Sequence, residues 1–119
     1  MKILLVDDDI FLRDMYATKF SEKGDTVTGV QDGEAALLEV QKGAYDVIIM
    51  DMVMPGMTGI DLLQAMKQAG VTAKCIVLSN QGEETDIEKA QENGAAGYII
   101  KAASIPSEVV EKVHQLVSQ

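Results

Sequence analysis

Short apolar segments alternate with stretches of helical periodicity, and this alternation limits the possible folds more than any other feature of the chain. Segment 3–6 reads Ile-Leu-Leu-Val without a polar residue, as a strand buried on both faces should. Residues 10–22 then carry apolar side chains at helical spacing, and Gly24 ends that pattern. The same unit recurs along the chain with short loops. A repeated strand–helix order predicts a parallel sheet with helices on both faces.

The repeats give five strands and five helices. We predict strands at 3–6, 26–30, 46–50, 75–78 and 97–100, with the more polar 26–30 at an edge. We predict helices at 10–22, 34–41, 60–68 and 85–92, and a last helix that begins at Ser104 or Pro106. The expected fold is α/β: a doubly wound, five-stranded parallel sheet of order 2-1-3-4-5 in a single domain, 1–119, with no output domain.

Composition excludes several classes of function. The formal net charge is −9, which disfavours direct binding to nucleic acid or to an anionic membrane. No apolar stretch approaches the ~20 residues that span a bilayer, and the apolar start is too short for a signal peptide. The single Cys75 cannot form an internal disulfide and should be a small buried residue. We therefore expect a soluble, cytoplasmic domain.

Polar residues follow four of the predicted strands. Asp7 and Asp8 come after the first strand, Asp51 after the third, Ser79 at the end of the fourth and Lys101 after the fifth. The carboxyl ends of parallel strands lie at one edge of a sheet, so these side chains should converge. Each alone could be an ordinary loop acid, turn residue or solvated base. Their coincidence at four strand ends favours a common site.

The charges of this set indicate its chemistry. Neighbouring carboxylates repel each other, and Mg²⁺ relieves the repulsion by taking oxygen ligands. Asp51 would be the nucleophile that forms an aspartyl phosphate. The Lys101 ammonium and the Ser79 hydroxyl would neutralise and bind the phosphoryl oxygens. Asp9, which precedes the helix 10–22, is better explained as its N-cap.

The chain resembles the receiver domain of bacterial two-component response regulators, over its whole length and with that family's spacing. The matching segments are Val6-Asp7-Asp8-Asp9, the run Asp-Met-Val-Met-Pro-Gly-Met-Thr-Gly from Asp51 to Gly59, Leu78-Ser79 and Tyr98-Ile99-Ile100-Lys101. The run that begins at Asp51 is the most specific of them. Arg13 sets the register that makes Asp7 and Asp8 the acidic pair and leaves Asp9 outside it.

The resemblance implies a role for each of these residues and a flavodoxin-like fold. Asp51 would accept the phosphoryl group, and Mg²⁺ would be held by Asp8, Asp51 and the backbone carbonyl of Val53, with Asp7 acting through water. Ser79 and Tyr98 would form the switch: the Ser79 hydroxyl moves to the phosphate, Tyr98 turns inward, and the populations of two surface states shift.

Partners are also implied by the resemblance. The phosphoryl donor would be a sensor histidine kinase or a histidine phosphotransfer protein. The output would be an unknown downstream protein, or a phosphorylation-dependent dimer, bound through helix 85–92, strand 97–100 and the last helix. The chain would be a switch and not an enzyme, beyond its own phosphorylation and slow dephosphorylation. A stand-alone receiver and a domain from a longer regulator remain open alternatives.

Departures from the family pattern lie beside the site. Ala102 follows Lys101 where the family usually has proline; a cis bond there would cost ~3 kcal/mol, so a trans bond or local strain is expected. Val53 and Gln81 lie two residues beyond Asp51 and Ser79, at positions that in the family tune the access of water to the phosphate. The apolar Val53 offers no general base, which predicts slow to moderate self-hydrolysis.

Three other functions fit the sequence less well. A dehalogenase-like phosphohydrolase would need an acid where Val53 stands, and a flavodoxin-like redox module would not place three carboxylates in its phosphate loop. A degenerate receiver would lack the Asp, Ser and Lys set. His114 is interpreted as a surface histidine, and the methionines near Asp51 as packing residues.

Overall fold

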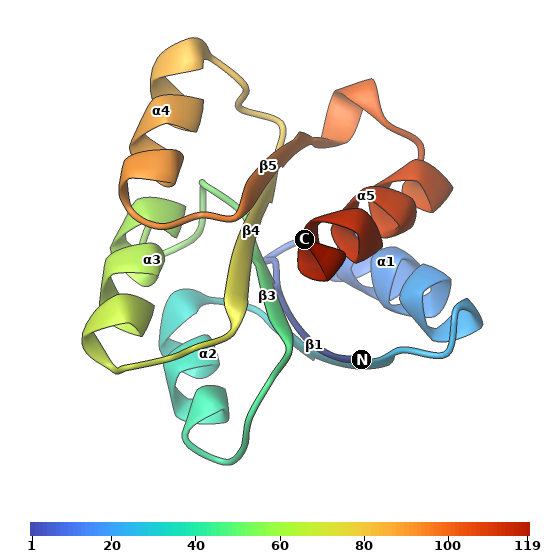
Figure 1. Ribbon diagram of the computed structural model, residues 1–119, viewed down its shortest axis with the longest axis horizontal. Coiled ribbons are helices and arrows are strands. Elements are labelled where there is room, and N and C mark those ends of the chain that lie inside the picture. Colours follow the sequence, from blue (N-terminus) through green and yellow to red (C-terminus); the bar gives the residue numbers. More distant parts are fainter.

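The computed structural model describes residues 1–119 and contains alternating strands and helices (Figure 1). The strands are β1 (Lys2–Val6), β2 (Thr26–Val30), β3 (Val47–Met50), β4 (Lys74–Ser79) and β5 (Gly97–Ile100). The helices are α1 (Ile10–Glu22), α2 (Gly33–Val40), α3 (Gly59–Gln68), α4 (Glu84–Glu92) and α5 (Pro106–Ser118). A short 3-10 helix, η1 (Lys101–Ala103), precedes α5 and is not predicted from the sequence. Of the two predicted starts for the last helix, Pro106 is the observed one, at the first helical position where proline fits best.

The sheet confirms the predicted fold class. Its five strands run in the order β2-β1-β3-β4-β5, and every neighbouring pair is parallel. In Figure 1 the helices α1 and α5 cover one face of this sheet, and α2, α3 and α4 cover the other. The connections that follow β1 and β3 leave toward opposite faces of the sheet, and in folds of this type ligands bind at the carboxyl ends of such a strand pair.

Both faces of the central strands are buried, which explains their continuous apolar sequences. In β1, Ile3 and Leu5 belong to the cluster on the α1/α5 face, whereas Leu4 and Val6 belong to the cluster on the opposite face. Alternate residues of a strand point to opposite faces, so a helix layer on each side leaves no position for a polar residue. The same logic buries Cys75, as predicted, and burial raises the pKa of its thiol to about 11.

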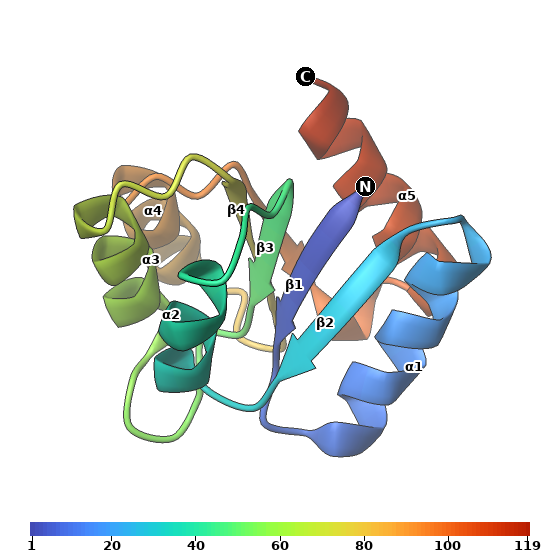
Figure 2. The ribbon, with the colours of Figure 1, turned by 90° about the horizontal axis from the view of Figure 1, so that it is seen from below.

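The strands end together at one edge of the sheet, and most helices begin there (Figure 2). We call this the carboxyl edge, made of residues 7–9, 51–58, 79–83 and 101–105; the opposite end is the amino edge. Asp9 caps α1, as predicted: its Oδ1 accepts hydrogen bonds from the backbone N–H of Phe11 and Leu12 at 3.0 and 3.2 Å. Asp32 caps α2 in the same way through the N–H of Ala35.

Two local expectations can now be compared with the structure. The third strand begins at Val47, one residue after the predicted start at Asp46. Asp46 precedes the strand and bonds Lys2 twice: its N–H donates to the carbonyl of Lys2 at 2.8 Å, and its carboxylate accepts the N–H of Lys2 at 2.6 Å. The chain contains no cis peptide bond, so Lys101–Ala102 is trans. No helix is long and apolar enough to cross a membrane.

Candidate functional site

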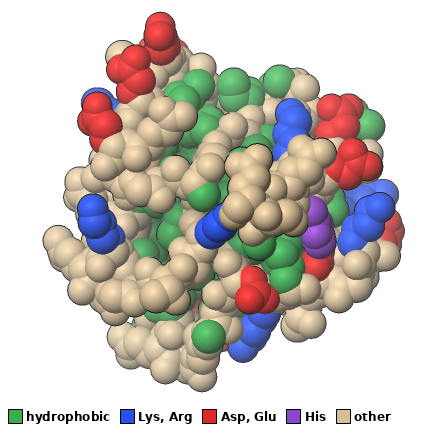
Figure 3. All heavy atoms as spheres, viewed as in Figure 1, with side chains coloured by type: hydrophobic (Ala, Val, Ile, Leu, Met, Phe, Trp, Pro, Cys, Tyr) green, Lys and Arg blue, Asp and Glu red, His purple; other side chains and the backbone are tan.

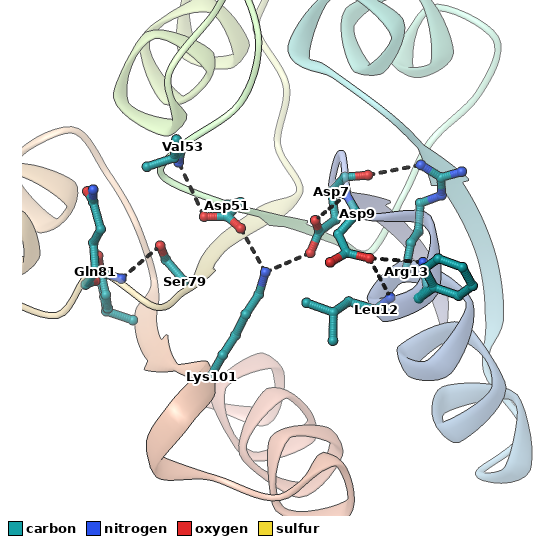
Figure 4. A network of polar contacts seen from close by, with 11 residues as sticks. Asp7, Asp9, Leu12, Arg13, Asp51, Val53, Ser79, Gln81 and Lys101 are labelled. Atoms are coloured by element: carbon teal, nitrogen blue, oxygen red, sulfur yellow. Dashed lines mark hydrogen bonds and ion pairs between the residues drawn. The ribbon is translucent and has the colours of Figure 1, made fainter.

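A lysine joins two carboxylates at the carboxyl edge (Figure 4). The Lys101 Nζ donates to Asp7 Oδ2 at 2.8 Å and to Asp51 Oδ2 at 2.7 Å. The side chains of Lys101, Asp7 and Asp51 are only 7%, 3% and 13% exposed. Three strand ends, separated by long stretches of sequence, thus meet at one ammonium group. The strand-end pattern in the sequence pointed to this convergence.

The two aspartates are positioned by the sheet itself. The backbone N–H of Asp7 donates to the carbonyl of Val30, and that of Asp51 donates to the carbonyl of Val6. These bonds extend the pairing of β1 with β2 and of β1 with β3 by one residue. Both side chains therefore leave the sheet from regular positions, and their mutual approach is fixed by the register of the strands.

The loop after Asp51 is held close to the backbone of that residue. Asp51 Oδ1 accepts the backbone N–H of Val53 at 3.2 Å, and the N–H of Gly59 donates to the carbonyl of Met52. A Cβ atom at Gly59 would lie 2.5 Å from the backbone oxygen of Asp51, so only glycine allows this approach. Thr58 begins α3 with a capping box. These contacts explain why aspartate begins the most specific run of the sequence and why threonine and glycine end it.

Electrostatics at the site depend on Lys101. Burial by itself lowers the pKa of a lysine, because it disfavours the charged form. Here the hydrogen bonds and negative charges of Asp51 and Asp7 outweigh burial, and the pKa of Lys101 is raised above its ordinary value. The ammonium therefore stays charged at physiological pH. One positive charge is shared by two carboxylates, which leaves the site with an excess of negative charge.

Ser79 and Tyr98 lie beside this cluster without touching it. Ser79 is 1% exposed, and its Oγ accepts the backbone N–H of Gln81 at 3.2 Å. Tyr98 packs on the cluster of the α2–α4 face, and its hydroxyl donates to the carbonyl of Gln81. Burial, followed by the negative charge of Asp86, raises the pKa of Tyr98. Both side chains thus meet at one residue of the β4–α4 loop.

Asp8 differs from the other acids of the predicted set. Its side chain is exposed, and it takes part in none of the hydrogen bonds or ion pairs of the protein. No group of three or more His, Cys, Asp or Glu side chains converges as a ready-made metal centre. The donors at this edge are nevertheless all oxygens, from Asp7, Asp51 and the backbone of the exposed Val53, and that chemistry suits Mg²⁺.

Two contacts were missed from the sequence. The Arg13 guanidinium donates from Nη1 to the backbone carbonyl of Asp7 at 2.9 Å, whereas the sequence used Arg13 only to set the register. At the amino edge, His114 Nε2 lies 2.6 Å from Oδ2 of the buried Asp25, so the histidine is not simply a surface residue. Arg13 lies only six residues after Asp7, near the start of α1, and this closeness was a usable signal. The pair formed by Asp25 and His114 had none, because neither residue directly follows a strand of the sheet.

Comparison with known proteins places this geometry in a family. The model of the response regulator receiver domain matches residues 3–114. Chemotaxis protein CheY of Pseudomonas aeruginosa is 34% identical, with 99% of each chain covered. Two-component response regulator PhoP of the same organism is 33% identical over 85% of this chain, which spans only 45% of the length of PhoP.

Solved structures agree with the sequence comparisons. The receiver domain of the Francisella response regulator 1452 superposes with a TM-score of 0.89 at 30% identity, and covers 98% of this chain and 96% of its own. The strand order and the match over nearly the whole sequence lead to one assignment. The chain belongs to the response regulator receiver domain family of two-component systems.

Proposed function

We propose that this chain is a signalling switch that is set by phosphorylation of Asp51. The observation that carries the proposal is the nearly buried contact of Lys101 Nζ with both Asp51 and Asp7 at the carboxyl edge. The Asp51 carboxylate is oriented by the N–H of Val53, and an ammonium already lies where phosphoryl oxygens would need positive charge. Phosphoryl transfer asks a protein mainly for such positioning and charge.

The phosphoryl donor is a phosphohistidine of a histidine kinase or of a histidine phosphotransfer protein. An Asp51 oxygen forms a bond to phosphorus while the P–N bond of the donor breaks. The electron pair of that bond stays on the imidazole nitrogen. The other ring nitrogen of the phosphohistidine carries a proton before transfer, so the donor leaves as neutral histidine. Lys101 keeps its contact with Asp7 and binds a phosphoryl oxygen in place of the carboxylate oxygen of Asp51.

Magnesium would be held by Asp51, Asp8 and the carbonyl of Val53, with Asp7 acting through water. When bound, Mg²⁺ supplies the positive charge that offsets the excess of carboxylates and the incoming phosphoryl group. Asp8 is suited to this role because its carboxylate is exposed and has no competing partner. Lys101 alone balances only one of the negative charges.

Output would follow from the contacts of Gln81. Ser79 leaves the N–H of Gln81 to bind a phosphoryl oxygen, and Tyr98 responds because it is bonded to the carbonyl of the same residue. The change reaches the surface of α4, β5 and α5, where a downstream protein, or a second copy of the chain, would bind in the cytoplasm. Figure 3 shows acidic side chains over α4 on this face.

Small phosphodonors provide the direct test. Acetyl phosphate with Mg²⁺ should add one phosphoryl group to the wild-type chain, and chelation of Mg²⁺ or the variant Asp51→Asn should prevent it. Asp14→Asn is the matched control, because Asp14 is an exposed acid of α1 and its carboxylate makes no contact. Intact-mass spectrometry measures the product. Modification of Asp51→Asn at the wild-type rate would refute the proposal.

A further inference from the structure

Asp7 is held at four points, which is more than its neighbours in the site. Its backbone N–H donates to Val30, Oδ1 accepts the N–H of Asp9 at 3.0 Å, and Oδ2 accepts Lys101. The fourth point is the backbone carbonyl, which accepts Nη1 of Arg13 at 2.9 Å. The Arg13 side chain, from the beginning of α1, thus contacts the peptide group between Asp7 and Asp8.

The path of the Arg13 side chain is made possible by a glycine in β2. A Cβ atom at Gly29 would lie 3.0 Å from Cδ of Arg13, 3.1 Å from Cγ and 3.2 Å from Nε. The aliphatic part of Arg13 therefore crosses the bare backbone of Gly29 before the guanidinium meets Asp7. Gly29 has no left-handed backbone conformation, so alanine at that position is limited only by this crowding.

Figure 4 shows that Arg13 and Lys101 approach Asp7 from opposite sides. Lys101 binds the side chain, and Arg13 binds the main chain. The carboxylate of Asp7 in turn sets one of the two contacts that position Lys101 Nζ against Asp51. A displacement of the Asp7 peptide would therefore be transmitted to the ammonium group beside the phosphorylated residue.

We infer that Arg13 is a positioning residue for phosphoryl transfer. Its side chain passes over the backbone of Gly29 and fixes the main chain of Asp7. The fixed Asp7 in turn holds the Lys101 ammonium against Asp51. This inference rests on the proposed function of Asp51. Arginine suits the task because its charge is permanent and its fork is rigid, so little freedom is lost when it binds. Lysine could supply the charge without the fork.

The first test compares initial rates of phosphorylation over a range of acetyl phosphate concentrations at saturating Mg²⁺. Arg13→Ala should lower the maximal rate about tenfold, short of the ~100-fold that a 1 Å misplacement can cost, with little change in KM for the donor. Arg13→Lys should recover part of the loss. Lys19→Ala is the matched control, because it removes a positive charge from the same helix, where Lys19 only pairs with Glu22 at 3.7 Å. A full wild-type rate in folded Arg13→Ala would overturn the inference.

The second test uses Gly29. Gly29→Ala should lower the rate in the wild-type background and have no further effect when combined with Arg13→Ala, because the added methyl group then has nothing to displace. An equal effect in both backgrounds would show that Gly29 acts independently of Arg13 and would contradict the inference. Both variants leave Asp51 and Lys101 in place, and circular dichroism establishes the temperature at which all are folded.

A third measurement separates this inference from the proposed function. The ¹³C resonance of the Asp7 carbonyl and the ¹⁵N resonance of Lys101 Nζ report the two contacts without any phosphodonor. Both should shift in Arg13→Ala and stay in place in Lys19→Ala. Unchanged resonances would refute the positioning role even if Asp51 is phosphorylated, whereas shifted resonances in a chain that accepts no phosphoryl group would refute only the proposed function.

Discussion

Both edges of the sheet contain a buried carboxylate with a basic partner, yet the two are balanced differently. At the amino edge, the Asp25 side chain is 2% exposed and receives one partner on each oxygen, the Met1 nitrogen at 3.1 Å and His114 Nε2 at 2.6 Å. At the carboxyl edge there are fewer basic partners: one Lys101 ammonium serves both Asp7 and Asp51, and their other carboxylate oxygens accept only backbone N–H groups. The amino edge has two basic groups for one carboxylate, and the carboxyl edge has one basic group for two carboxylates.

This difference separates stability from function. A buried carboxylate with a basic partner on each oxygen stabilises one arrangement of the chain and resists change. A pair of carboxylates that share one ammonium retains an excess of negative charge, which can be relieved by a further cation. The carboxyl edge is therefore able to change state, and the amino edge keeps β1, β2 and α5 together while it does so.

The largest effect should come from removing the shared ammonium. Lys101→Met should lower the rate of Asp51 phosphorylation by about 10²–10³-fold, the usual effect of losing one preorganised positive or donor group. Lys112→Met is the matched control, because the exposed Lys112 bonds only the hydroxyl of Ser104. Rates with acetyl phosphate measure the change. A fall of less than a few-fold in Lys101→Met would mean that the carboxyl edge does not depend on this charge.

The amino edge should show the opposite pattern. Asp25→Asn should lower the free energy of unfolding by about 2 kcal/mol, because it weakens short hydrogen bonds to a charged acceptor in a buried place. The rate of phosphorylation should be unchanged in the folded variant. Urea denaturation measures the first quantity, and His114→Gln provides an independent variant of the same pair. A stable Asp25→Asn with a slow rate would reverse the proposed division between the two edges.

The carboxyl edge was far more predictable from the sequence than the amino edge. Asp7, Asp51 and Lys101 each follow a strand, and the rules of parallel sheets bring strand ends together whatever the loops do. His114 could not be placed in this way. It lies between Val113 and Gln115 in α5, and its partner lies in the turn before β2, so only the tertiary packing of α5 on α1 brings them into contact.

Element boundaries were predicted less well than the elements themselves, and for local reasons. β1 begins at Lys2 and not at Ile3, because Lys2 still pairs with Thr26 of β2. Hydrophobicity alone does not indicate how far the backbone pairing of a strand extends. η1 was missed because Lys101–Ala103 lacks a periodic apolar pattern. The orientation of Ser79 toward Gln81 was also beyond sequence, since a hydroxyl at a strand end can bond any nearby N–H group.

One glycine at each edge of the sheet allows the same comparison of rate and stability to be made through backbone crowding. Gly59→Ala should cost about 1–3 kcal/mol of stability and slow phosphorylation about tenfold, because the new Cβ would meet backbone atoms of Asp51 and Met52 at 2.5 and 2.9 Å. Gly70, which follows α3 at the amino edge, has φ +74° and nothing within 4 Å of an added Cβ. Gly70→Ala should cost only about 1 kcal/mol of stability and leave the rate unchanged. Equal losses of rate in the two variants would refute the special role of Gly59.

The smallest effect should be a difference in alkaline stability between the wild type and Lys101→Met. The pKa of Lys101 is raised in the folded protein, where burial is outweighed by Asp51 and Asp7. The stabilisation from this charge is therefore complete below the unfolded pKa of 10.5 and is lost as the pH rises through the folded pKa. The unfolding free energy of the wild type should exceed that of Lys101→Met by a constant amount up to about pH 10. Above that pH the difference should decrease.

Comparing the two proteins removes the titration of the Cys75 thiol from the result, because that thiol, with its pKa of about 11, is present in both. Tyr16 titrates differently in the two proteins: burial raises its pKa, the Lys101 charge lowers it, and Lys101→Met removes that lowering. Lys112→Met should show no such narrowing, because its ammonium contacts a neutral hydroxyl at the surface. Urea denaturation at a series of pH values measures all three proteins. If the difference in unfolding free energy instead widened with pH, the carboxylates of Asp7 and Asp51 would not be stabilising the charged form of Lys101. The proposed charge balance at the carboxyl edge would then be wrong.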